Sequence, residues 1–199
     1  MGLTTKLSRQ SSRKLRPLFV AVSCFIILIS LSSQAGAGTR SSFSNRPAVT
    51  LRARYVGPLE IGVATMSKVR SLEGTPSRVF VASASGAPLG GSPVNFSGSL
   101  WQYDCGFGCY SLYGFTGQVL KAFGSTDPAL VAFGRVRVGS SLSVAESVPG
   151  AAFSGFEVQC PGVDYPAPKG YQFIALVSSS KVHYWYQAAP DADFSACGS

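Results

Sequence analysis

Histidine and acidic residues are scarce in this chain, which has a single histidine, His183, and nine Asp and Glu residues among 199. A serine or cysteine nucleophile needs a base within hydrogen-bond reach and an acid that orients this base. His183 is the one histidine available, and it lies in an aromatic segment, residues 181–187, that is typical of a β-strand. We therefore expect no catalytic residues, no cofactor and no metal site. A secreted hydrolase is the alternative.

Acidic residues are absent from the N-terminal region before Glu60, where a basic stretch precedes an apolar block that spans positions 18–31. Small side chains follow, with Ala35 and Ala37 at the two positions that a signal peptidase reads. This order is typical of a secretory signal peptide and predicts cleavage after Ala37. The block is shorter than the ~20 residues of a membrane-spanning helix. The alternative is a retained leader that anchors a type II membrane protein, and membrane contact is expected only in that case.

The leader carries much of the positive charge. The whole chain has 17 basic and 9 acidic residues, a formal net charge of +8 and a pI near 9.5. Without the five basic residues of the leader, 12 basic and 9 acidic residues remain, which is a formal net charge of +3. A strongly basic surface is the electrostatic signature of nucleic-acid binding, so the lower charge argues against nucleic acid as a partner.

Five cysteines are present, and because Cys24 leaves with the predicted leader, an even set of four remains. An even count in an exported chain indicates disulfides. We predict a Cys105–Cys109 bond across a tight loop with two glycines, and a Cys160–Cys197 bond that ties the C-terminal tail to the domain. The C-x3-C spacing of the first pair does not match the C-x2-C pairs typical of zinc sites and redox motifs.

Glycine (22 residues) and proline (12) are abundant, and short apolar runs alternate with turn residues along the chain. This pattern predicts an all-β fold, a single disulfide-bonded antiparallel sandwich or barrel-like domain that follows an N-terminal signal helix. We expect the signal peptide at residues 1–37, a flexible arm at 38–47 and the β domain at 48–199.

Three local predictions accompany this fold. Residues 117–123 are the one candidate for a short helix of one or two turns, residues 141–146 are expected to form a strand, and residues 86–93 a mobile loop between strands. No internal repeat period is visible in the sequence.

Aromatic residues gather in two segments, near residues 101–113 and 184–186. Alternation along a strand turns some of these side chains outward, and exposed Trp and Tyr are enriched at interaction hot spots. If the two segments are neighbours, they present a candidate binding face for an unidentified protein or glycan partner. Its residues are Trp101, Tyr103, His183 and Trp185.

One modification motif is present. Asn95 begins an Asn-x-Ser triplet, which makes it a candidate glycosylation site in a eukaryotic export pathway. Together, the leader, the cysteines and the shortage of catalytic residue types predict a secreted or cell-surface protein. We expect a non-enzymatic binding or structural module of a cell-surface, envelope or particle assembly.

Overall fold

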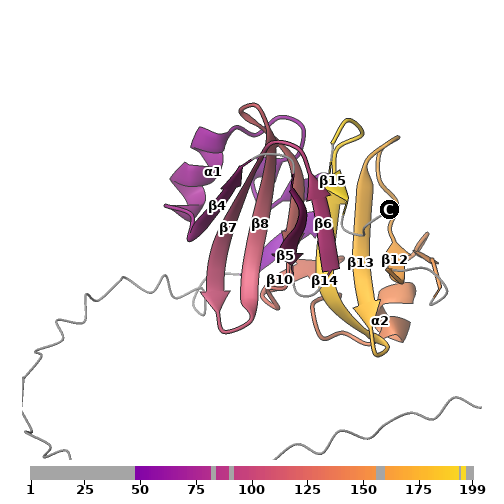
Figure 1. Cartoon of the computed structure of the whole chain (residues 1–199). Coiled ribbons are helices and arrows are strands. Elements are labelled where there is room, and N and C mark those ends of the chain that lie inside the picture. Colours follow the sequence, from indigo (N-terminus) through magenta and orange to yellow (C-terminus); the bar gives the residue numbers. More distant parts are fainter. Residues whose placement is uncertain (1–47, 82–83, 90–91, 156–159, 193, 196–199) are drawn as a thin grey trace, which may run out of the picture. The chain divides into compact units, whose positions relative to one another are not determined.

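In the part of the chain that the structure describes, the strands form three sheets, and two short helices accompany them (Figure 1). The computed structural model describes residues 48–81, 84–89, 92–155, 160–192 and 194–195. The predicted signal peptide and arm lie outside these residues and stay predictions. The described chain is mostly β, as expected. It is not purely antiparallel, however, because β1 pairs with β10 in parallel.

The elements have the following bounds. The eight-stranded sheet contains, in spatial order, β11 (Ala152–Phe153), β12 (Gly162–Asp164), β13 (Gln172–Ser178), β14 (Lys181–Ala188), β9 (Val119–Ser125), β8 (Cys109–Thr116), β7 (Ser99–Gly106) and β4 (Arg78–Val81). The four-stranded sheet contains β10 (Leu130–Ala132), β1 (Val49–Arg52), β2 (Tyr55–Val56) and β3 (Leu59–Glu60). The three-stranded sheet contains β15 (Phe194–Ser195), β6 (Ser92–Phe96) and β5 (Ala84–Leu89). The helices are α1 (Met66–Glu73) and α2 (Leu142–Glu146).

The eight-stranded sheet consists of two equivalent halves, β4-β7-β8-β9 and β11-β12-β13-β14, which meet where β9 pairs with β14. Ser111 faces Ser125 in the β8–β9 hairpin, and Phe173 faces Gln187 in the β13–β14 hairpin. The offset in sequence from Ser111 to Phe173 equals the offset from Ser125 to Gln187. Each half is preceded by one helix, α1 or α2.

The same irregularity recurs at the same place in both hairpins. The register of β8–β9 shifts just before the Phe115–Leu120 pair, and the register of β13–β14 shifts just before the Val177–Val182 pair. The offset between these two pairs is again the one that relates the halves. A β-bulge bends a strand and increases its twist, so both hairpins curve over the core in the same way.

The helices also dock in equivalent ways. Thr65, the N-cap of α1, forms a β-bridge with Val119 at the start of β9. Ser141, the N-cap of α2, forms a β-bridge with Lys181 at the start of β14. Both cap side chains accept a hydrogen bond from a backbone N–H in the first turn of the helix. Each cap therefore fixes its helix on the last hairpin of its half.

A tyrosine ties each helix to the third strand from the centre of the sheet. The Tyr103 hydroxyl of β7 donates to the Gly74 carbonyl at the end of α1, at 3.3 Å. Tyr165, which follows β12, donates to the Ala145 carbonyl of α2, also at 3.3 Å. The two tyrosines are related by the same sequence offset as the hairpin pairs. No repeat was visible in the sequence because the two halves share backbone pairing, whereas most equivalent side chains differ.

β4 pairs with β7, and β5 pairs with β6, both in antiparallel orientation. Val81 faces Ser99 in the eight-stranded sheet, and Ala84 faces Phe96 in the three-stranded sheet, so the register passes unchanged from one sheet to the other. Of residues 86–93, expected to be a loop, 86–89 belong to β5 and 92–93 to β6, while 90–91 lie outside the described residues. Gly98 sits at the transition with a φ of 128°, and a Cβ there would collide with the Phe115 carbonyl oxygen of β8. Only glycine allows this close approach.

Both faces of the eight-stranded sheet carry a buried cluster. The larger cluster joins this sheet to the four-stranded sheet and both helices; it includes Leu51, Val69, Phe123, Phe173 and Trp185. The smaller cluster on the opposite face includes Leu112, Tyr184 and Tyr186. β14 therefore has apolar side chains buried in both directions.

The local predictions at 117–123 and 141–146 were wrong. Residues 119–125 form β9 because Val119–Ser125 pairs with β8 on one side and β14 on the other. Residues 142–146 form α2 because Ser141 caps the helix and the helix residue Ala145 is fully buried. In each case docking against the rest of the domain decided between helix and strand.

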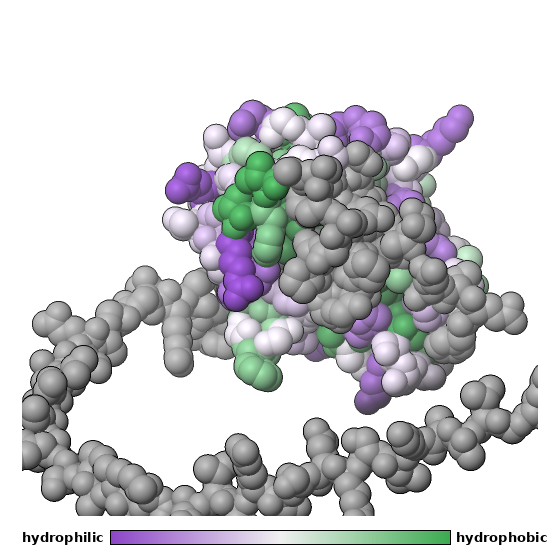
Figure 2. Space-filling view, viewed as in Figure 1, coloured by the Kyte–Doolittle hydropathy of each residue, from purple (hydrophilic) through white to green (hydrophobic). Residues whose placement is uncertain are grey.

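The eight-stranded sheet ends at β4, which has one neighbour in the described part of the chain. Val79 and Val81 of this edge strand are 50% and 72% exposed. Apolar side chains can be seen in this region of the surface in Figure 2. An exposed edge strand can pair with another chain.

Candidate functional site

A cavity of about 260 Å³ lies between the first half of the eight-stranded sheet, the four-stranded sheet and the end of α1. Its walls combine aliphatic side chains with hydroxyl and carboxylate groups, a composition typical of small-molecule sites. The lining residues are Val49, Val56, Pro58, Leu72, Glu73, Ser111, Tyr113, Asp127 and Leu130.

Asp127 is the most buried acidic residue of the cavity, with 6% of its surface exposed. Its Oδ1 accepts a hydrogen bond from the Ala129 backbone N–H at 2.8 Å, and its own N–H donates to Ser125 Oγ at 3.0 Å. These bonds fix the carboxylate at the start of the turn that leads into β10. Within the described chain, no lysine or arginine forms a salt bridge with it. Burying an unpaired carboxylate is costly.

Glu73 supplies the second carboxylate, from the last turn of α1. The Tyr103 hydroxyl lies near this end of the helix, and its pKa is raised to about 12, mainly by burial and further by the charge of Glu73. The raised pKa keeps Tyr103 neutral and hydrogen-bonded to the Gly74 carbonyl. The end of α1 is thereby held beside the cavity.

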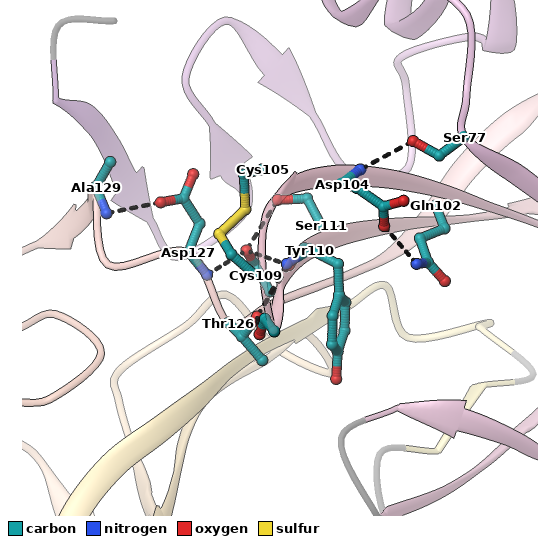
Figure 3. The surroundings of a disulfide bond; sticks show 12 residues. Ser77, Gln102, Asp104, Cys105, Cys109, Tyr110, Ser111, Thr126, Asp127 and Ala129 are labelled. Carbon is teal, nitrogen blue, oxygen red and sulfur yellow. Dashed lines mark hydrogen bonds between the residues drawn. A yellow bond between two sulfur atoms is a disulfide. The ribbon is translucent and has the colours of Figure 1, made fainter. Parts of the chain in front are cut away.

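The predicted Cys105–Cys109 disulfide is present and closes the tip of the β7–β8 hairpin beside Asp127 (Figure 3). The two sulfur atoms and an Asp127 carboxylate oxygen all lie within 4.8 Å of one another. Sulfur atoms joined in a disulfide are not the thiolates that bind metal ions. Here the bond braces the strand ends next to the buried carboxylate, and Phe107 at the tip is fully exposed.

The cavity has an equivalent place in the second half of the sheet. At the sequence offset that relates the halves, Phe173 corresponds to Ser111, Ala175 to Tyr113 and, beyond the strand end, Ala189 to Asp127. The Phe173 ring stacks on Phe133 with centroids 5.6 Å apart, and Phe133 also contacts Tyr165 at 4.8 Å. In the second half, aromatic rings therefore fill the place that corresponds to the cavity beside Ser111 in the first half.

The predicted aromatic binding face is not formed. Trp185 is fully buried, with its ring 5.6 Å from that of Phe173, and Tyr103 is 3% exposed. Trp101 is half-buried against Phe115. The prediction was wrong because it assumed one solvent-facing side for β14, whereas both faces of that strand are covered.

His183 occupies the bulge of β14 and is half-buried. Burial lowers its pKa, which favours the neutral ring. Its Nδ1 is buried without a hydrogen-bond partner, so no acid orients the ring through that atom. His183 therefore lacks the arrangement that would make it the base of a catalytic triad.

The other sequence-predicted sites are placed only in part. Cys160 is disulfide-bonded, but its predicted partner Cys197 lies outside the described residues. The cleavage positions Ala35 and Ala37 also lie outside them. Asn95 pairs with Ser85 and Ser195 in the three-stranded sheet, and its glycosylation stays a prediction.

Sequence reasoning missed the cavity residues Glu73, Ser111 and Asp127. Asp127 and Ser111 are far apart from Glu73 in the sequence and belong to no motif. The available signal was small: Asp127 precedes a proline, so it could have been read as the start of a turn with an inward carboxylate.

Comparisons with known proteins assign no family. No family model matches the chain, and no curated protein matches it. One solved structure with some similarity is an extracellular protein containing a SCP domain from Bacillus anthracis str. Ames, at 8% identity and a TM-score of 0.44. The match covers 63% of this chain and 43% of that one. In the described part of the chain, no helix is long and apolar enough to cross a membrane.

Proposed function

We propose that this chain is an exported, non-enzymatic binding module with a sandwich-like β domain, and that it takes a small ligand into the cavity beside Asp127. One observation carries the proposal. Aromatic rings fill the position around Phe173 in the second half of the sheet, whereas Ser111 and Asp127 border a hollow in the first. An unfilled cavity and a buried carboxylate both lower the free energy of unfolding. A ligand that fills the cavity would offset this loss.

The location proposed for the protein is the cell surface or the medium. The leader pattern and the Cys105–Cys109 bond support it, since disulfides persist in oxidising compartments. Mass spectrometry of the exported protein is expected to find Gly38 at the N-terminus. An intact Met1 on exported protein would instead favour the membrane-anchored alternative.

The binding role is tested by NMR with three probes of matched size: n-butylammonium, n-butanol and butyrate. We expect at least one of them to shift the backbone amides of Ser111, Tyr113 and Leu130 in the full-length protein. The Ser111→Phe variant introduces the side chain found at the equivalent position, Phe173. Its ring should fill the cavity and abolish these shifts.

A second variant tests the cavity independently, in case Ser111→Phe does not fold. Leu72 lines the cavity from α1 and is 38% exposed, so Leu72→Trp adds bulk without repacking the core. It is expected to weaken binding while the rest of the spectrum is retained. If none of the three probes shifts the cavity amides of the wild-type protein, the cavity is not a binding site of this kind.

A further inference from the structure

We propose that the cavity binds an organic cation, an ammonium or guanidinium group carried on a short apolar stem. This inference rests on the proposed binding function and specifies its ligand. It follows from the charges at the cavity, from its apolar walls and from the surroundings of Asp127.

The charged groups that line the cavity all have one sign. Glu73 and Asp127 contribute carboxylates, and none of the nine lining residues is lysine, arginine or histidine. Ser111 and Tyr113 add hydroxyl groups, which can accept hydrogen bonds. An anionic ligand would meet the like charge of buried Asp127, whereas a cation would gain an opposite one.

The buried position of Asp127 makes this attraction stronger than a surface contact. The Asp127 residue is 6% exposed, and its carboxylate accepts a hydrogen bond from one backbone N–H, that of Ala129. Charge-assisted hydrogen bonds are about twice as strong as neutral ones. A ligand N–H donor beside Asp127 would therefore form a charge-assisted hydrogen bond with this carboxylate.

The remaining walls fit an organic group better than a bare metal ion. Aliphatic side chains of Val49, Val56, Leu72 and Leu130 offer no donor atoms, and the two neighbouring sulfur atoms are joined in a disulfide. A volume of about 260 Å³ exceeds that of a single ion and accommodates several carbon atoms. These surfaces suit the apolar stem of an alkyl cation.

Two sources carry this chemistry: a free alkylamine, or the side chain of a lysine or arginine in another polypeptide. Both present the same group on the same kind of stem. The experiment therefore includes n-butylammonium, n-butylguanidinium and the peptide Gly-Lys-Gly, together with its Nε-acetylated form.

The test is a calorimetric and NMR titration of the full-length protein with these probes, with the neutral n-butanol and with the anionic butyrate. We expect the cations to bind at least about tenfold more tightly than n-butanol, and their affinity to fall as salt is added. Asp127→Asn keeps the acceptor for the Ala129 N–H and is expected to weaken cation binding by about tenfold.

Asp164→Asn is the matched control, since Asp164 is exposed in the second half of the sheet. It should leave cation binding unchanged. If n-butanol or butyrate binds in the cavity as tightly as n-butylammonium, the cation inference is wrong although the binding function stands. If Gly-Lys-Gly binds and its acetylated form does not, a polypeptide side chain can supply the cation; if only the free amines bind, the ligand is a small molecule. If no probe binds, both proposals are overturned.

Discussion

Ser111 and Phe173 occupy equivalent positions in the two halves of the eight-stranded sheet, yet Ser111 borders a cavity and Phe173 stacks in an aromatic cluster. The backbone that holds them is the same, because each faces a hairpin partner at the same separation along the chain, Ser125 or Gln187. Side-chain size therefore decides where this architecture is hollow.

This difference predicts unequal costs for truncation to alanine. Phe173→Ala should lower the free energy of unfolding by about 3–5 kcal/mol, because it empties a packed position. Ser111→Ala removes one hydroxyl, bonded to Ser125 Oγ at 2.8 Å, and should cost about 1 kcal/mol. Urea denaturation of both variants measures the two values. Similar losses would mean that the two positions are not packed differently.

The Cys105–Cys109 bond should contribute modestly to stability. It closes a short loop, with a sequence separation of 4, and the chain-entropy model gives about 2 kcal/mol for so small a loop. The double variant Cys105→Ser/Cys109→Ser is therefore expected to unfold at lower urea concentration, with a free energy of unfolding reduced by that amount. It should also bind the cation probes more weakly, since the hairpin tip lies beside Asp127. Unchanged binding of the cation probes would show that the disulfide does not support the cavity.

The two tryptophans should differ in access to solvent. Trp185 is fully buried and Trp101 half-buried, so a Trp101→Phe variant that retains only Trp185 should resist quenching by acrylamide. The Trp185→Phe variant, which retains Trp101, should be quenched more readily. Equal quenching would contradict the burial of β14 on both faces.

Gly98 should tolerate no side chain. A Cβ there meets the Phe115 carbonyl oxygen, whereas a Cβ at Gly106, with a similar positive φ of 141°, meets nothing within 4 Å. Gly98→Ala and Gly106→Ala therefore carry comparable backbone strain but differ in contact. We expect Gly98→Ala to lose about 1–3 kcal/mol more in urea denaturation. Equal losses would show that backbone strain alone matters at Gly98.

Alkaline pH should destabilise the domain through Tyr103. Its pKa is about 12 in the folded protein, so its contribution to stability is complete below about pH 10 and is lost as pH rises towards about 12. Unfolding by urea at about pH 8 and about pH 11 should show a smaller difference between wild type and Tyr103→Phe at the higher pH. A constant difference would contradict the role of burial at this hydroxyl.

The sequence by itself determined the features that depend on neighbours along the chain. Alternating apolar residues and frequent glycines predict a mostly β domain, and two glycines between Cys105 and Cys109 allow the short disulfide. Period-two alternation also placed Trp185 and Gln187 on one face of their strand. Both are fully buried, and Gln187 Nε2 donates to the Arg52 carbonyl of the four-stranded sheet.

Only the tertiary structure decided which strand faces are covered, where the two halves of the sheet correspond and where a cavity remains. Trp185 is buried because the four-stranded sheet packs on the face of β14 that it occupies, a contact between segments distant in sequence. Residues 119–125 form a strand because both neighbouring strands offer hydrogen bonds to it. Glu73, Ser111 and Asp127 meet because α1, β8 and the turn after β9 converge. Burial and pairing are set by these long-range contacts, which no local pattern of residues encodes.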